Sequence, residues 1–237
     1  MNRGPGERPK SLRREHMFRY SGVIELVSGC RIGGSDDILQ IGGTDLTCIK
    51  DPASGRPYLP GSSIKGKMRS ELEKQTGTME GSQPSKTGPV ARVFGPHFDP
   101  NHNMGPTRIR VHDAFPLEGQ LPQVELKTES VNNRQTGTAQ HPRTLERVVP
   151  GVKFRLEIDI DVYDIDKTFQ YQSLDKEKYD GAEAIIQVVL DGLTLLERSG
   201  LGSGTSRGSG QIRIIDDDPP VRRLPPRKRP PLDDLFT

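Results

Sequence analysis

Residues 60–69, PGSSIKGKMR, form the first stretch of the sequence whose residue types and spacing suit a ligand. From Gly61 they follow the phosphate-binding pattern G-x-x-x-x-G-K, but Met68 stands where a nucleotide-binding loop has a Ser or Thr that coordinates Mg²⁺. Such a loop also follows a buried strand, and Pro57 and Pro60 break any central strand here. The pattern therefore indicates a helix start that holds a phosphate of a polynucleotide, through Ser62, Ser63, Lys65, Lys67 and Arg69.

A second candidate is the segment 199–211, SGLGSGTSRGSGQ, in which glycines and serines surround a single arginine. Glycine lets a backbone approach a ligand closely, and Arg207 adds a positive charge beside Gly204. A flexible linker is the alternative interpretation. We favour a binding loop because the segment lies between a predicted helix and a predicted strand.

Hydrophobic periodicity supplies the elements that must position these segments. Alternating apolar residues predict strands over 18–28, 107–115, 153–163 and 211–215. Ile64, Met68 and Leu72 recur at helical spacing and predict a helix over 63–75, and a longer apolar stripe predicts another over 181–198. The order strand, helix, strand, then strand, helix, strand predicts an α+β fold of the ferredoxin-like (RRM-like) βαββαβ type, with one antiparallel sheet, two helices on one face and long loop insertions.

Three segments fall outside this predicted domain of residues 18–215. The basic arm 1–17 and the Pro- and Arg-rich tail 216–237 have the composition of disordered segments. The residues between the second and third predicted strands are too many for a hairpin turn, so we expect a projecting arm there.

Positive and negative charges are segregated along the chain. Residues 127–155 carry six bases and two acids, whereas residues 157–183 carry nine acids and three lysines. Such clustering of cations indicates a polyanionic partner. The sequence shows neither an apolar signal segment nor a membrane-length apolar run, and its two cysteines, Cys30 and Cys48, do not suggest a disulfide framework. We therefore expect a cytoplasmic protein.

Five segments together resemble a known family: RIGGSDD, YLPGSSIKGKMRSELE, RVHDAF, ELKTESVNNRQTGTAQHPRTLERVVPGVKF and LGSGTSRGSGQI. They are similar to the RAMP proteins of CRISPR interference complexes, and most closely to the repeated backbone subunit of type III-A (Csm) effectors. The likeness spans roughly residues 18–215 in order and spacing. It implies a ferredoxin-like palm, a thumb hairpin at about 126–149, and head-to-tail assembly along a guide RNA. The implied partners are crRNA, target RNA, further copies of the chain and other type III effector subunits.

The resemblance also implies a catalytic residue. The family's catalytic aspartate falls in a segment like IGGTDLTCIKD, which makes Asp45 the expected catalytic and metal-binding residue, with Mg²⁺ or Mn²⁺ as cofactor. The implied reaction is endonucleolytic cleavage of target RNA at intervals of about six nucleotides, leaving a 2′,3′-cyclic phosphate and a 5′-OH. An Asx turn is the local alternative for Asp45. Asp36 and Asp37 are rival acids, but their segment looks more like a guide-binding edge.

The same resemblance implies RNA contacts from several loops, at Gly34, Ser35, Lys127, Arg134, Arg143, Gly204 and Arg207. Because aromatic residues make up 5% of the chain and Trp is absent, we expect phosphate and 2′-OH contacts to dominate over base stacking. His97 and His102 have no cysteine nearby in the sequence, so we expect no structural zinc. Two alternatives stay open, a non-catalytic RNA-binding scaffold subunit and a nucleotide hydrolase, and the second requires that the isolated chain bind ATP.

Overall fold

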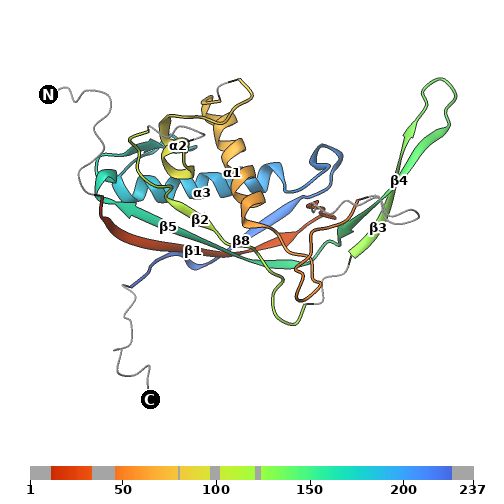
Figure 1. Ribbon diagram of the computed structural model, residues 1–237, viewed down its shortest axis with the longest axis horizontal. Helices are drawn as coiled ribbons and strands as arrows, with labels where there is room; N and C mark the ends of the chain where they lie inside the picture. The colour runs from red at the N-terminus through yellow and green to blue at the C-terminus, as the bar shows by residue number, and fades with distance from the viewer. Residues whose placement is uncertain (1–11, 34–45, 80, 97–101, 121–123, 226–237) are drawn as a thin grey trace, which may run out of the picture.

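The protein is described from a computed structural model, which covers residues 12–33, 46–79, 81–96, 102–120 and 124–225. Its main sheet has four strands in the order β2-β5-β1-β8, and every neighbouring pair is antiparallel. These strands are β1 (Arg14–Leu26), β2 (Ile109–Val111), β5 (Lys153–Tyr163) and β8 (Ile212–Arg223). Helices α1 (Gly61–Thr76), α2 (Gly88–Phe94) and α3 (Gly181–Ser199) lie on one face of this sheet (Figure 1).

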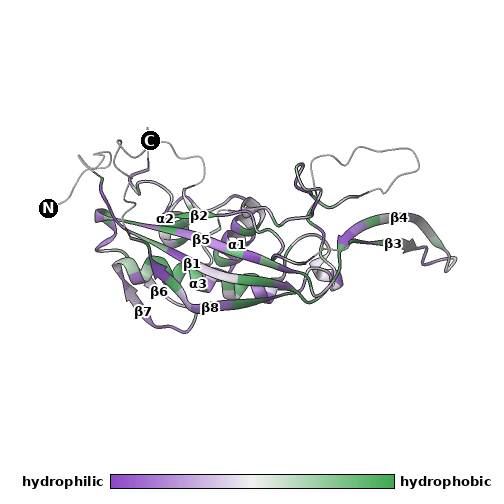
Figure 2. Ribbon diagram, turned by 90° about the horizontal axis from the view of Figure 1, so that it is seen from below, coloured by the Kyte–Doolittle hydropathy of each residue, from purple (hydrophilic) through white to green (hydrophobic). Residues whose placement is uncertain are grey.

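The core lies between the sheet and the helices. Alternate side chains of β5 are buried there, as the sequence predicts: Phe154, Leu156, Ile158, Ile160 and Val162. The intervening side chains of β5 lie on the opposite face of the sheet. Hydrophilic and hydrophobic residues alternate along the strand, as its changing colour shows (Figure 2). The alternation of β5 thus reflects a sheet that is covered on one side.

Helix α1 crosses α3 at Gly192. A Cβ atom added to Gly192 would lie 3.1 Å from both the Met68 Cε and the Leu72 Cδ1 atoms. The side chains of Ile64, Met68 and Leu72 are fully buried, which confirms the predicted apolar stripe of this helix. The Met68 that interrupts the nucleotide-binding pattern is therefore a core residue.

Several bounds differ from the sequence prediction. Residues 14–17 and 216–223, predicted to be disordered, extend β1 and β8. Main-chain pairing holds this polar sequence in strands, because His16 and Met17 pair with Val162 and Asp161 of β5, and residues 221–223 pair with 18–20 of β1. The predicted strand 107–115 shortens to β2 (Ile109–Val111), and the chain beyond it makes the isolated bridges of Ala114 and Pro116.

Two small hairpins complete the described chain. Strands β3 (Val124–Asn132) and β4 (Ala139–Val148) form an antiparallel pair that projects from one end of the molecule, away from the helices (Figure 1). Strands β6 (Gln170–Gln172) and β7 (Lys178–Asp180) pack beside α3, and short 3₁₀ turns span Asp164–Asp166 and Thr205–Arg207. No helix among the described residues is long and apolar enough to cross a membrane.

Candidate nucleic-acid interface

An open groove of about 450 Å³ lies where three segments distant in sequence meet. One wall is a single face of α1, carrying Ser63, Gly66, Lys67 and Ser70. The other walls are the segment 31–33, which follows β1, and the segment 201–203, which follows α3. The structure thus brings the predicted helix site beside the glycine-rich loop and the start of the RIGGSDD segment.

The N-terminus of α1 is not open to a phosphate. The Gly61 N–H donates to the Asp113 carboxylate over 2.7 Å, so an internal anion already occupies this end of the helix. Gly61 is also buried, and a Cβ atom there would lie 2.2 Å from the Val111 carbonyl oxygen. The prediction of a free helix start is therefore wrong for Gly61. The helix offers the groove the side of its first two turns instead.

The three predicted cations of α1 point in different directions. Lys67 lines the groove, and its Nζ also pairs with the Glu71 carboxylate at 2.8 Å. Lys65 Nζ reaches the Ile109 carbonyl oxygen at 3.5 Å, and burial, together with the charge of Arg69, lowers the pKa of Lys65.

The Arg69 side chain is held by hydrogen bonds within the protein. It donates from Nε to Glu73 over 2.8 Å and from Nη2 to the Ser85 carbonyl over 2.9 Å, and its side chain is 16% exposed. Lys65 and Arg69 thus connect α1 to the main chain that packs around it, at Ile109 and Ser85. Ser63 and Lys67 face the groove, while Ser62 is exposed but does not line it.

The glycine-rich loop packs against the segment that follows β1. The Ser203 N–H donates to the Arg31 carbonyl over 2.8 Å, and a Cβ atom at Gly202 would lie 2.3 Å from that same oxygen. Gly204 adopts a left-handed backbone conformation with φ 76° at the start of the 3₁₀ turn that carries Arg207. Glycine is therefore required at Gly202 both by its φ of 83° and by a close approach.

Three of the predicted cations converge about midway along the β3–β4 hairpin. Lys127, Arg143 and Arg207 each lie within 3.5 Å of the Glu129 carboxylate. Partial burial acts to raise the pKa of Glu129, but hydrogen bonds from Lys127 and Arg143 and the charge of Arg207 outweigh it and lower the pKa. One carboxylate and three cations leave a surplus of positive charge. Arg134 is exposed in the turn at the far end of the hairpin.

The expected catalytic residue itself lies outside the described residues, as do Gly34, Ser35, Asp36 and Asp37. The ends of its loop are placed, however. Leu46, which directly follows Asp45, forms a parallel bridge with Leu145 of β4, and its carbonyl oxygen accepts the Glu146 N–H over 2.8 Å.

At the other end of this loop, Gly33 bridges Cys48. The Cys48 N–H donates to the Glu146 carboxylate over 2.9 Å, and Lys50 Nζ pairs with the same carboxylate at 2.7 Å. Gly33 and Leu46, the described residues on either side of 34–45, therefore both lie near the β3–β4 hairpin.

Sequence reasoning missed three residues of this region, namely Ser70, Asp113 and Glu129. Ser70 carries a usable signal, since it follows Ser63 and Gly66 on one helical face. Asp113 and Glu129 carry no such sequence signal, because acidic residues are not expected where phosphates bind.

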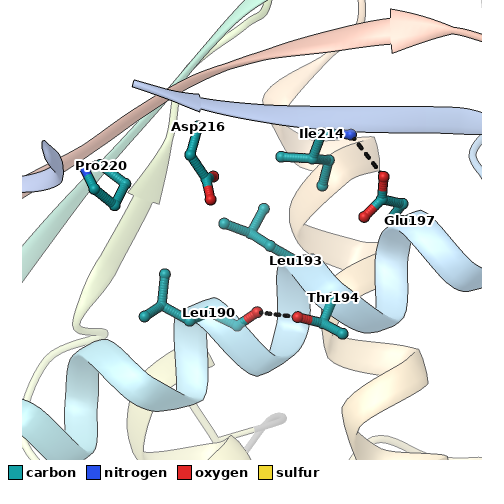
Figure 3. Close-up of a pocket in the computed structure, with 7 residues that line it drawn as sticks. All are labelled: Leu190, Leu193, Thr194, Glu197, Ile214, Asp216 and Pro220. Carbon is teal, nitrogen blue, oxygen red and sulfur yellow. Dashed lines mark hydrogen bonds between the residues drawn. The ribbon is translucent and has the colours of Figure 1, made fainter. Parts of the chain in front are cut away.

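The hollow between α3 and β8 has a different chemistry (Figure 3). Its floor is apolar, with Leu190, Leu193 and Ile214, and the carboxylates of Glu197 and Asp216 lie at its sides. The Ile214 N–H donates to Glu197 over 3.0 Å. Two carboxylates without a cation among the lining residues make this hollow unsuitable for a phosphate.

A family model that describes the RAMP superfamily matches residues 23–213. The chain belongs to the RAMP superfamily. Within that superfamily, it is 37% identical to a protein of Methanothermobacter thermautotrophicus named CRISPR system Cms endoribonuclease Csm3, over 86% of this chain and 85% of the relative. Proteins of the same name from Methanocaldococcus jannaschii and Streptococcus thermophilus are 36% and 34% identical, over 82% of this chain and 77% and 86% of the relatives.

Solved structures of RAMP proteins share the fold. A Csm3–Csm4 subcomplex of the type III-A interference complex aligns with a TM-score of 0.53 at 24% identity, over 90% of this chain and 89% of the matched chain. A type III-B Cmr-β complex bound to cognate target RNA aligns with a TM-score of 0.56 at 19% identity, over 88% and 61% of the two chains. The mixed α and β architecture with antiparallel sheets is therefore that of RAMP structures.

Proposed function

We propose that this RAMP protein is a crRNA-binding backbone subunit of a type III CRISPR effector and that it cleaves complementary target RNA, acting in the cytoplasm in antiviral defence. The observation that carries the proposal is the meeting of three family motifs in one groove beside a cationic hairpin, in a chain that matches endoribonucleases named Csm3 over most of its length. Phosphates of a guide would lie along Ser63, Lys67 and the backbone of the glycine-rich loop.

The strand order and the helices on one face support a ferredoxin-like assignment of the main sheet. The hairpin β3–β4 would act as the thumb, with Lys127 and Arg143 about midway along it and Arg134 at its tip meeting the RNA. Base pairing with the guide would supply sequence recognition, because these cations contact phosphates and do not read bases.

We assign the cleavage step to Asp45. Its carboxylate would accept the proton of a target 2′-OH as that oxygen bonds to the adjacent phosphorus, while the bond to the 5′ oxygen breaks and that oxygen takes up a proton. The anchoring of Leu46 on β4 supports this role, since it fixes one end of the Asp45 loop at the hairpin base.

A divalent cation would fit this chemistry, because a bound Mg²⁺ or Mn²⁺ supplies positive charge against the negative charge that develops on the phosphoryl oxygens. The described residues contain no group of three His, Cys, Asp or Glu side chains arranged to hold a metal, and Asp45 lies outside them. Metal dependence therefore rests on the sequence pattern around Asp45. It predicts that EDTA stops cleavage, that added Mg²⁺ or Mn²⁺ restores it, and that target affinity changes little.

The decisive experiment assembles the effector with Asp45→Ala and supplies end-labelled complementary RNA. We expect cleavage to fall at least about a hundredfold while target affinity is unchanged. Asp36→Ala and Asp37→Ala serve as matched controls, and both should cleave at the normal rate and spacing.

Regularly spaced cleavage by the Asp45→Ala complex, with unchanged binding, would show that the catalytic assignment is wrong. A wild-type complex that binds target but never cleaves it would support the alternative, a structural scaffold subunit. Binding of ATP by the isolated chain would instead favour a nucleotide hydrolase, and the burial of Met68 argues against that.

A further inference from the structure

Tyr58 and Phe115 form a stacked pair of aromatic rings at the protein surface. Their ring centroids lie 5.4 Å apart and their planes differ by 18°. Phe115 is 46% exposed, although its side chain is large and apolar. A single exposed apolar side chain is common, but the two stacked rings together form one aromatic surface.

Main-chain hydrogen bonds hold both rings in place. Leu59 and Ala114 exchange two bonds, of 2.9 and 2.8 Å, which sets their neighbours Tyr58 and Phe115 opposite each other. Leu59 and Ala114 point into the core, with exposures of 2% and 0%, so the two aromatic rings point outward. The Phe115 carbonyl also accepts the Arg155 N–H of β5 over 2.9 Å. The pair is thus preorganised and would lose little entropy on binding.

The pair lies beside the described segment 46–50, which directly follows Asp45 in the sequence. Lys50 bridges Pro57, which places Tyr58 beside Ile49, and Ile49 donates its N–H to the Ile32 carbonyl over 2.9 Å. Ile49 is three residues from Leu46, or about 10 Å along an extended chain.

The charges near the rings suit RNA. Arg56 is exposed and lies two residues before Tyr58. Lys50 on the adjacent segment is 39% exposed, and its Nζ pairs with the Glu146 carboxylate at 2.7 Å. The nearby Asp51 carboxylate is engaged within its own turn by the Ser54 N–H and hydroxyl. An outward aromatic ring beside cations is the arrangement that proteins use to stack a base and hold its phosphate.

We propose that Tyr58 and Phe115 form a stacking site for an unpaired nucleobase of the bound RNA, with Arg56 contacting an adjacent phosphate. This inference rests on the proposed function, because it presupposes that the chain binds RNA. A nucleobase is the fitting occupant because the exposed surface is the size of one ring pair, whereas a stable contact between copies requires a much larger apolar area. The low aromatic content of the sequence argues against base stacking as the main mode of RNA binding. Stacking thus acts here at one position only.

The test is an abasic scan in the assembled complex. Two series of RNAs, one of guides and one of targets, each carry a single abasic nucleotide that moves along the strand, and affinity is measured rather than cleavage. We expect the wild-type complex to lose at least about fivefold in affinity when the abasic nucleotide falls at the stacked position. Phe115→Ala should weaken binding of intact RNA by a similar factor and abolish the sensitivity at that position. Phe115→Tyr, which keeps the ring, should behave as wild type.

The outcomes separate this site from the proposed function. A flat scan for a wild-type complex that binds RNA tightly would overturn the stacking site and leave RNA binding intact. Failure of the wild-type chain to bind either RNA would remove both. A Phe115→Ala complex that keeps the position-dependent sensitivity of the wild type to an abasic nucleotide would also overturn the inference. So would a Phe115→Ala complex that assembles a different number of copies on an intact guide, because the pair would then be a contact between copies.

Discussion

At the scale of single residues, the glycine-rich loop shows how backbone conformation determines which residue is tolerated. Gly208 and Gly210 both have left-handed φ values, 81° and 71°. A Cβ atom at Gly210 would lie 1.9 Å from the Leu201 carbonyl oxygen, whereas a Cβ atom at Gly208 would meet nothing within 4 Å. The two positions therefore share backbone strain and differ in steric clash.

This difference predicts unequal effects of alanine. Gly208→Ala should lower the free energy of unfolding by about 1 kcal/mol, from conformational strain. Gly210→Ala should cost about 1–3 kcal/mol more, because the clash with main chain requires the loop to move. Urea denaturation of the two variants measures the difference. Equal losses would show that the loop relaxes freely and is not a fixed wall of the groove.

The two cysteines provide a prediction on pH. Burial raises the pKa of Cys30 to about 12, and burial together with the charge of Glu146 raises that of Cys48 to about 11. Their Sγ atoms donate to the carbonyl oxygens of Leu201 and Glu146 over 3.4 and 3.3 Å. Both thiols should therefore stay protonated and unreactive in the folded chain.

We expect iodoacetamide at pH 8 to label neither thiol in the native protein and both in urea, as measured by mass spectrometry. Because the folded-state pKa values are raised, folding favours the protonated thiols. Stability from this source is complete below the ordinary thiol pKa and is lost as pH rises through about 9 to 12. Native labelling at the rate of a free thiol would contradict the burial of these side chains.

At the scale of elements, a buried ion pair ties β2 to the turn after β5. The Asp166 carboxylate accepts hydrogen bonds from Arg108 Nε and Nη2 over 2.9 and 2.7 Å, and Arg92 of α2 donates to it over 3.0 Å. The side chains of Arg108 and Asp166 are both fully buried. Their arrangement holds α2, β2 and the 3₁₀ turn at one end of the sheet.

Removing the carboxylate leaves a buried guanidinium without its counter-ion. Asp166→Ala should therefore lower the free energy of unfolding by about 3–5 kcal/mol. Glu71→Ala, which removes the partner of Lys67 and Lys74 on the exposed side of α1, should cost less than about 1 kcal/mol. Thermal and urea unfolding compare the two. A small loss for Asp166→Ala would mean that the arginines find other acceptors.

Periodicity predicted the elements that have one face in the core, namely β5, α1 and α3. It failed where the main chain or a distant partner decides the structure. The polar start of β1 is a strand because it pairs with β5, and the polar end of β8 is a strand because it pairs with β1; the side-chain pattern carries no trace of either pairing. Arg108 falls on the outward phase of a predicted strand, yet it is buried by Asp166, far along the chain.

The site follows the same rule. Local sequence predicted Ser63 and Lys67 as one candidate binding segment and the glycine-rich loop as a second, and the structure places them around one groove. The capping of α1 by Asp113 and the stacking of Tyr58 on Phe115 could not be predicted, because each joins residues from separate loops. Lys65 and Arg69 show the converse, since cations adjacent in sequence point to different faces of a helix.

At the scale of the whole molecule, several acids of the run 157–183 are paired with arginines of the same chain. Arg19 of β1 pairs with Asp159 at 2.7 Å, and Arg110 of β2 pairs with Asp161 at 2.8 Å, both on the open face of the sheet. Asp166 forms a buried ion pair with Arg108. The small net charge therefore conceals a surface on which the groove and the β3–β4 hairpin keep positive charge that the sheet does not.

This distribution predicts which cations determine the salt dependence of RNA binding. Lys67 and Lys74 lie on the same helix and pair with the same Glu71 oxygen, at 2.8 and 2.9 Å, but Lys67 lines the groove and Lys74 does not. Lys67→Met should weaken binding of single-stranded RNA and reduce the slope of log affinity against log salt by about 0.7, because one phosphate contact and its released counter-ion are lost. Lys74→Met should leave both unchanged, since it removes an equal charge outside the groove. Salt titrations of the full-length chain by fluorescence anisotropy measure both slopes, and equal effects of the two variants would mean that net charge, rather than the groove, governs binding.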